Sequence, residues 1–186
     1  YPNEVEQKDS KTYLKKIDKS KVIAGPPESM SKSKKNTVDP EYIINQYGAD
    51  AVRLFILSDS PPEKDIQWSD AGVAGANKFL QKLWNLNNSI LTKKENDTNK
   101  HEEIKFNLEI DNFVNKIDSS IKNFRFNVSI ALFHQLYNYL RNKIDSKIGN
   151  DHLKNSMIKF MKLMIPFAPH LAYECLEFLN CKLRIY

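Results

Sequence analysis

The sequence has 186 residues, 41% of them hydrophobic and 27% charged, which is enough to bury one or two cores. It has no run of about 18 apolar residues and no charged start before an apolar segment, which argues against a membrane helix or a secretory signal and predicts a cytoplasmic protein. The net charge is +5. The four histidines are scattered, and no pair of them has the spacing of zinc ligands. Cys175 and Cys181 have no companion cysteines and are interpreted as reduced packing residues.

Positive charge gathers near the amino terminus. Residues 1–35 contain nine lysines and five acidic residues, whereas residues 36–186 contain nineteen basic and eighteen acidic residues. Such a region favours phosphates or an RNA backbone, although a solvated surface has the same composition. Between residues 11 and 25, apolar side chains alternate weakly with lysines, which predicts short strands that end at the Gly-Pro-Pro sequence of residues 25–27.

The stretch from Ser29 to Asn36, called here the 29–36 loop, alternates small hydroxyls with lysines and has Met30 as its single large apolar residue. Hydroxyl groups, backbone N–H groups and lysine ammonium groups all donate hydrogen bonds to phosphate oxygens. The pattern therefore indicates a phosphate-binding loop. It is also typical of a solvated loop or linker.

Two short helices are predicted after this loop. Asp39, which is followed by proline, can cap a helix over about residues 40–47, and Gly48 can end it. Asp50 is expected to cap a second helix that runs to about Leu57.

A long helix is predicted after a proline-containing connection. Residues 58–69 are expected to form a turn or extended segment, with Trp68 packed under the next helix. Ser69 or the residue after it caps that helix, in which Gly72 and Gly75 would let another backbone approach closely. The apolar residues at helical spacing in this helix are Val73, Ala76, Leu80, Leu83, Trp84 and Leu91.

Helical spacing continues to the end of the chain. The polar residues 93–103 are expected to form an exposed connection, and three apolar stripes and a last helix follow. Short connections between such helices predict an α-helical bundle, so the fold is expected to be mainly α. The stripes are Ile110, Phe113, Val114, Ile117 and Ile121, then Val128, Ala131, Leu132, Gln135, Leu136, Tyr139 and Leu140, then Leu153, Met157, Phe160, Met161 and Met164, and the last helix contains Leu171, Cys175 and Leu176.

Three motifs give the sequence a specific resemblance. The letters M-S-K-S-K-x-N at residues 30–36, D-P at 39–40 and Y-G-A-D-x-x-R at 47–53 resemble the second signature ("KMSKS") loop and following segment of class I aminoacyl-tRNA synthetases. Residues 60–84 are similar to the leucyl branch of this family. The letters P-F-A-P-H-L-A at residues 166–172 resemble its anticodon-binding helical domain.

The resemblance implies how the chain is organised. Residues 1–68 would be the end of a catalytic domain that carries the signature loop with short strands and helices, and residues 69–186 a truncated anticodon-binding type of α-helical bundle. The chain starts at Tyr1 and breaks off after a helix, so an interior piece of a longer protein is expected. The other signature motif, the amino-acid pocket and the editing domain would lie upstream.

The resemblance also implies ATP-dependent chemistry, in which leucine is activated to leucyl-adenylate and transferred to tRNA(Leu), with Mg²⁺ accompanying ATP. Lys32 matches a motif lysine of the family and would be the catalytic residue that holds the departing pyrophosphate. The residues implied in ATP binding are Met30, Ser31, Lys32, Ser33 and Lys34. Ser29 stands where most relatives have a lysine. The expected partners are leucine, ATP and tRNA(Leu), with no membrane, and a monomer is expected.

Two other interpretations remain open at this point. A valyl, isoleucyl or methionyl synthetase is similar as far as Arg53, and the upstream amino-acid pocket would decide. A non-catalytic tRNA-binding module that retains the loop as a remnant would explain Ser29. Two interpretations also remain for the polar residues Asp39, Asp50 and Arg53. They either shape a platform beneath the 29–36 loop, or they are ordinary helix caps and a surface ion pair. His170, at a helix start, is expected to be neutral in a packing or capping role.

Overall fold

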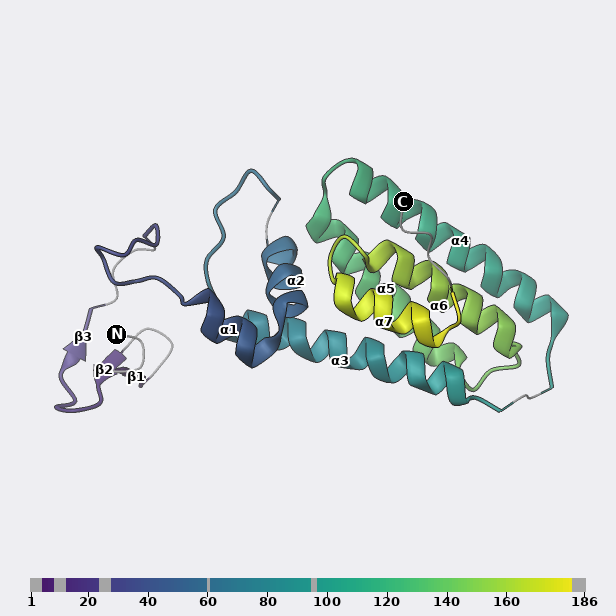
Figure 1. Ribbon diagram of the computed structural model, residues 1–186, viewed down its shortest axis with the longest axis horizontal. Coiled ribbons are helices and arrows are strands. Elements are labelled where there is room, and N and C mark those ends of the chain that lie inside the picture. Colours follow the sequence, from purple (N-terminus) through teal and green to yellow (C-terminus); the bar gives the residue numbers. More distant parts are fainter. Residues whose placement is uncertain (1–4, 9–12, 24–27, 60, 95–96, 182–186) are drawn as a thin grey trace. The chain divides into compact units, whose positions relative to one another are not determined.

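The computed structural model describes residues 5–8, 13–23, 28–59, 61–94 and 97–181. The chain forms two compact units, residues 1–42 and residues 43–186. The first unit contains three short strands and the 29–36 loop, and the second contains the helical bundle (Figure 1). The boundary between residues 42 and 43 separates two units that pack within themselves. The domain boundary that the sequence predicts after residue 68 is a functional one and stays a prediction.

The first unit contains an antiparallel sheet in the order β1-β2-β3. The strands are β1 (Val5–Gln7), β2 (Tyr13–Lys15) and β3 (Lys21–Val22). Tyr13 lies opposite Val22 in the register of β2 and β3. These two strands confirm the expectation for residues 11–25, whereas β1 is too short for an alternating pattern to reveal it. The Gly-Pro-Pro sequence at residues 25–27 lies outside the described residues.

Helix α1, Pro40–Tyr47, has the ends that its sequence predicts. The Asp39 carboxylate accepts a hydrogen bond from the N–H of Glu41 at 3.0 Å, which satisfies one donor of the first turn. At the other end, Gly48 has a φ of +84°, and its N–H donates to the carbonyl of Ile44 at 2.8 Å. Glycine adopts this conformation without the steric cost of a side chain.

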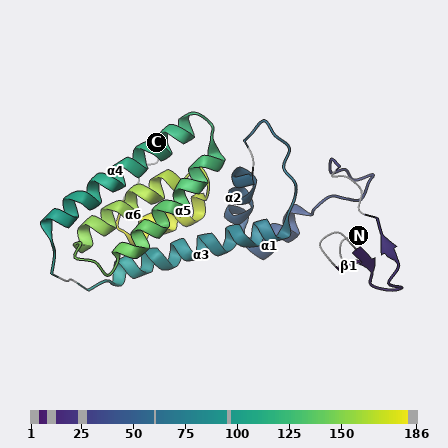
Figure 2. The same ribbon diagram turned by 180° about the vertical axis from the view of Figure 1, so that it is seen from behind.

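The second unit is a bundle of helices, which confirms the predicted fold class. Its helices are α2 (Ala49–Asp59), α3 (Asp70–Thr92), α4 (Lys100–Lys122), α5 (Phe126–Lys143), α6 (Asn150–Met164) and α7 (Pro169–Phe178). Figures 1 and 2 show α4, α5 and α6 lying near one another, and α4 contacts both of the others. Helix α2 contacts α3, α5 and α7, so it belongs to the bundle.

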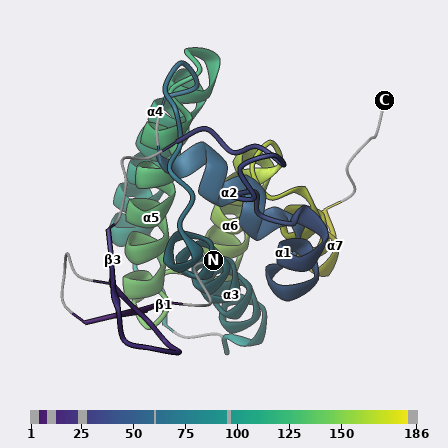
Figure 3. The same cartoon turned by 90° about the vertical axis from the view of Figure 1, so that its left-hand side faces the viewer.

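One apolar face of each long helix forms the core of the bundle. Figure 3 shows α3, α4, α5 and α6 grouped around this common interior. The stripes expected in α4 and α6 are confirmed, since Ile110 and Ile117 of α4 and Leu153, Met157 and Phe160 of α6 are buried. Burial of each such side chain contributes about 1.5–3 kcal/mol, so these stripes stabilise the fold.

The stripe expected in α5 is partly wrong. Val128 is 41% exposed, whereas Ile130 and Phe133 are buried. The buried face of α5 includes position 129 in place of position 128. Ser129 is fully buried, and its hydroxyl lies 2.7 Å from that of Ser120 on α4. Two hydroxyls that satisfy each other allow a polar residue to occupy an apolar face.

Helix α3 begins where the sequence predicts and packs against α2. Ser69 Oγ accepts the N–H of Gly72 at 3.1 Å, which confirms the cap. The Trp68 indole donates to Asp70 at 2.8 Å and its ring meets that of Phe55 edge to face at 5.4 Å, which confirms the packing role. The expectation for Gly72 is corrected, because the neighbour that needs the space is the Phe55 ring and not a backbone.

Candidate functional site

Asn36 closes the 29–36 loop. Its Oδ1 accepts the N–H of Ser31 at 2.8 Å, and its Nδ2 donates to the carbonyl of Ser29 at 3.3 Å. One side chain therefore holds the far end of the loop against its start. Sequence reasoning assigned Asn36 no role, although an asparagine at the end of a polar turn often bonds nearby backbone, and this signal identifies it.

The hydroxyls of the loop form a tight turn. Ser31 Oγ and Ser33 Oγ lie 3.0 Å apart, and Ser31 Oγ also accepts the N–H of Lys34 at 3.2 Å. The N–H of Lys35, a residue with a φ of +52°, donates to the carbonyl of Lys32 at 3.1 Å. A turn of this kind can present its remaining hydroxyl and N–H donors to an anion.

Lys34 is held in an exposed ion pair. Its Nζ lies 2.7 Å from Oε2 of Glu28, and the two side chains are 52% and 53% exposed. The hydrogen bond from Lys34, and then its charge, lower the pKa of Glu28 below the ordinary value of 4.5. Such an exposed pair contributes little to stability, so Lys34 can leave Glu28 for a phosphate at small cost.

Lys32 is exposed at the tip of the turn. Its ammonium group makes no ion pair or hydrogen bond with any other residue that the structure describes. Met30, just before the turn, is 47% exposed. The structure therefore places all five predicted ATP ligands in or beside one exposed turn, with one charge engaged by Glu28 and the charge of Lys32 available.

The donors of this loop fit a nucleotide phosphate better than a metal ion. Hydroxyl, N–H and ammonium groups donate to phosphate oxygens, whereas Mg²⁺ takes oxygen ligands such as carboxylates. Glu28 is the single acidic residue within residues 28–36. The described ranges contain no cluster of three His, Cys, Asp or Glu side chains that could hold a metal. The described side chains of this loop therefore suit an anion better than a metal ion.

Asp50 caps a helix that is distant in the sequence. Its Oδ2 accepts the N–H of Leu171 at 2.8 Å, and its Oδ1 accepts the N–H of His170 at 3.4 Å and lies 2.8 Å from His170 Nδ1. The first N–H groups of α7 thus find their acceptor on α2. The expectation that Asp50 caps its own helix is wrong, because α2 begins at Ala49 and the carboxylate points to α7.

Arg53 forms a second link between the same two motifs. Its Nη2 donates to the carbonyl of Pro166, 113 positions away, at 2.7 Å. Residues 47–53 therefore bond residues 166–172 within the bundle, a contact that the motifs alone do not reveal. The side chain of His170 is 78% exposed, so the expected packing role is corrected, although its backbone takes part in the cap.

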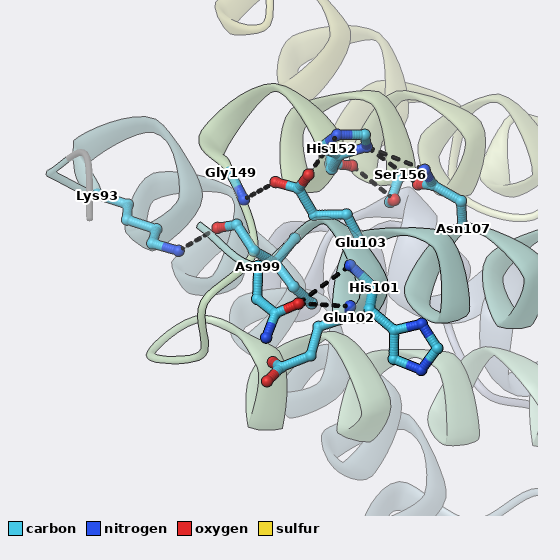
Figure 4. A network of polar contacts seen from close by, with 10 residues as sticks. Lys93, Asn99, His101, Glu102, Glu103, Asn107, Gly149, His152 and Ser156 are labelled. Atoms are coloured by element: carbon cyan, nitrogen blue, oxygen red, sulfur yellow. Dashed lines mark hydrogen bonds and ion pairs between the residues drawn. The ribbon is translucent and has the colours of Figure 1, made fainter. Parts of the chain in front are cut away.

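A polar network joins the start of α4 to the start of α6 (Figure 4). Glu103 Oε1 accepts the N–H of Gly149 at 3.0 Å, and its Oε2 lies 3.6 Å from His152 Nε2. Asn107 lies 3.0 Å from Nδ1 of the same histidine. The expected exposed connection is corrected here, because α4 begins at Lys100 and the Glu103 side chain is 15% exposed. These groups bond one another, so the network is a structural support.

Comparison with known proteins points to one family. The profile of the family described as tRNA synthetases class I (I, L, M and V) matches residues 4–69. Over 84% of its length the chain is 39% identical to the leucine–tRNA ligase of Ehrlichia canis (strain Jake), of which it covers 19%. Over its whole length it is 37% identical to the leucine–tRNA ligase of Rickettsia canadensis (strain McKiel). The chain is therefore similar to class I tRNA synthetases, and to leucine–tRNA ligases over its whole length.

A solved structure supports the fold of the chain. The LeuRS chain in a ternary complex with tRNA and LeuAMS from Agrobacterium radiobacter K84 matches it with a TM-score of 0.71 and 24% identity, over 83% of this chain and 21% of that one. The chain spans 22% of the length of the Rickettsia canadensis ligase. Within its described residues, no helix has the length and apolar character needed to cross a membrane.

Proposed function

We propose that the protein containing this chain is a leucine–tRNA ligase, which uses ATP to form leucyl-adenylate and transfers the leucyl group to tRNA(Leu). The observation that carries the proposal is the exposed turn in which the available ammonium of Lys32 stands between the hydroxyl-bearing Ser31 and Ser33. Identity to leucine–tRNA ligases over the whole chain supports leucine as the amino acid.

In the first step, a carboxylate oxygen of leucine bonds to the α-phosphorus of ATP, and the bond from that phosphorus to the bridging oxygen of pyrophosphate breaks. Negative charge builds on the pyrophosphate. Lys32 stabilises this charge because its long side chain can follow it, while Ser31 and Ser33 keep the shape of the turn. Lys34 exchanges Glu28 for a phosphate oxygen. In the second step, the terminal ribose hydroxyl of tRNA takes the leucyl group and AMP leaves.

Substitution of Lys32 tests its role directly. In the complete product of the gene, Lys32→Ala should slow single-turnover formation of leucyl-adenylate by about 3 kcal/mol, or about 100-fold, while leucine binding changes little. Lys16→Ala is the matched control, because it removes an exposed lysine of the same unit outside the loop. An unchanged activation rate in Lys32→Ala would remove this residue from the mechanism.

Pyrophosphate exchange tests the reaction and its substrate. Exchange that depends on leucine supports the proposal, whereas exchange with valine, isoleucine or methionine alone would assign the chain to another branch. No exchange with any amino acid would favour the non-catalytic tRNA-binding module to which Ser29 points. The proposal also takes the protein to be a cytoplasmic monomer, which light scattering and cell fractionation would test.

A further inference from the structure

Helices α3 and α5 are rich in cations and poor in acids. Helix α3 contains Lys78 and Lys82 with Asp70 as its single acidic residue, and α5 contains Arg141 and Lys143 without any acidic residue. Helix α4, by contrast, contains five acidic residues. Together α3 and α5 contain four cations and one acidic residue, so their net charge is positive, as is that of α6 with its three lysines and one acidic residue.

A cleft of about 390 Å³ lies where α3 and α5 meet. Lys82 from α3 and Arg141 from α5 both line it, so two cations from different helices face one space. Asn85, Ser89 and Tyr137 add amide and hydroxyl groups to the lining. The cleft therefore combines two positive charges with neutral hydrogen-bonding groups.

The two cations of the cleft are available to a ligand. Neither Lys82 nor Arg141 makes an ion pair or a side-chain hydrogen bond with another residue in the described part of the chain. Asp145 is the single acidic residue of the lining, so the cleft keeps a net positive charge. Two lysines elsewhere in the bundle are paired, Lys122 with Asp118 and Lys159 with Asp111, each at 2.6 Å.

Aromatic rings lie next to these cations. The imidazole of His134 stacks on the ring of Phe79 with centroids 3.8 Å apart, and Tyr137 meets Phe79 edge to face at 5.9 Å. Partial burial, and then the charge of Lys82, lower the pKa of His134 below the ordinary 6.5, which favours the neutral ring. Phe79 is buried, so His134 and Tyr137 are the rings of this group that reach solvent. Such rings beside cations suit RNA, which has sugars and bases as well as phosphates, better than an acidic peptide.

We propose that the cleft between α3 and α5 binds a backbone phosphate of RNA, with Lys82 and Arg141 as its charged ligands. The planar guanidinium of Arg141 pairs with two phosphate oxygens, and Lys82 adds a point charge. Asn85 and Tyr137 donate hydrogen bonds to phosphate or ribose oxygens. This inference rests on the proposed function, in which tRNA is the partner, and it places the contact on a named surface of the bundle.

Binding of a leucine tRNA transcript to the 186-residue chain tests the proposal. The Lys82→Gln/Arg141→Gln variant should raise Kd at least about 10-fold at about 0.1 M salt. It should also make the slope of log affinity against log salt shallower by about 1.5, since each lost phosphate contact contributes about 0.7–0.9. The matched control, Lys122→Gln/Lys159→Gln, removes the same charge from paired lysines and should change Kd less than about threefold.

Three results would overturn the proposal. Equal losses in the cleft variant and its control would show that total charge, and not the cleft, sets affinity. Displacement of tRNA by poly-glutamate at an equal concentration of charge would indicate an acidic protein partner. Unchanged tRNA binding in the cleft variant would exclude both cations as ligands.

Two further measurements keep these outcomes distinct. Lys82→Arg/Arg141→Lys keeps both charges and should retain most of the binding, and thermal melting of every variant checks that the bundle is folded. Pyrophosphate exchange by the unsubstituted gene product tests the proposed function separately. If the unsubstituted gene product shows no exchange but the cleft variant loses tRNA binding, the proposed function alone is contradicted. If the gene product shows exchange but the cleft variant binds tRNA unchanged, the cleft proposal alone is contradicted.

Discussion

The ring of Phe55 decides which residue position 72 accepts. A Cβ on Gly72 would lie 2.5 Å from one ring atom and 2.8 Å from another, and the ring is only 4% exposed. We expect Gly72→Ala to lower the free energy of unfolding by about 1–3 kcal/mol through overpacking, despite the better helix propensity of alanine. Gly75→Ala is the control, since nothing lies within 4 Å of its Cβ position. Equal urea midpoints for both variants would contradict this explanation.

The imidazole of His134 makes stability depend on pH. Its pKa in the folded chain lies below the ordinary 6.5, because burial and then Lys82 disfavour the charged ring. The unfolded chain therefore takes up the proton first, so this contribution is complete above about pH 6.5 and decreases as the pH falls toward the folded pKa. We expect His134→Gln to remove this loss, measured by urea unfolding at about pH 7.5 and about pH 5. Parallel pH profiles for the two proteins would show that His134 has no such effect.

At the level of elements, α7 depends on α2 for its amino-terminal cap. Asp50→Ala would leave the N–H groups of His170 and Leu171 without their acceptor, so we expect the free energy of unfolding to fall by about 1–3 kcal/mol. Asp50→Asn keeps one oxygen acceptor and should retain part of this stability. Chemical denaturation of both variants separates the two contributions, and identical losses would indicate that the charge matters and the hydrogen bonds do not.

Local signals explain which elements could be predicted from the sequence. Asp39, Gly48 and Ser69 act on groups within four positions of themselves, so spacing alone identified the helix ends that they form. The buried face of α5 was harder, because the burial of Ser129 depends on Ser120, which lies on another helix. A helical stripe records which residues are apolar, and it does not record which polar residues satisfy each other.

The 29–36 loop shows the same limit at the candidate site. Its composition predicted a cluster of phosphate donors, and the structure places those donors in one turn. The closing role of Asn36 and the pairing of Lys34 with Glu28 depend on the path of the backbone, which composition does not define. The roles of the five residues in ATP binding stay predictions that the substitutions above would test.

At the scale of the whole molecule, the 186-residue chain spans 22% of the Rickettsia canadensis ligase. By resemblance to class I synthetases, ATP would be held between the signature loop and a nucleotide-binding fold, so the chain would supply one side of that pocket. We expect the chain alone not to form leucyl-adenylate and to bind tRNA with an affinity that falls steeply with salt. By the same resemblance, a leucine tRNA with a changed anticodon should bind about equally.

An adenylation assay and tRNA titrations at two salt concentrations check this expectation, with the complete gene product as the positive control. Measurable adenylation by the isolated chain would show that one side of the pocket is sufficient. Tight binding that ignores salt and depends on the anticodon would show that phosphate contacts are not the main source of affinity.

The cap that joins α2 to α7 also determines when the helical bundle can finish folding during synthesis. Asp50 and Leu171 are 121 positions apart, so the ribosome makes the acceptor long before the donor. At about 5–20 residues per second, this interval lasts about 6–25 s. Until α5 and then α7 are made, Ala51, Leu54 and Phe55 lack part of the cover that these helices later help to provide. The nascent chain therefore presents an incompletely covered apolar surface on α2, and α7 completes the cover of the helix that is made first in the bundle.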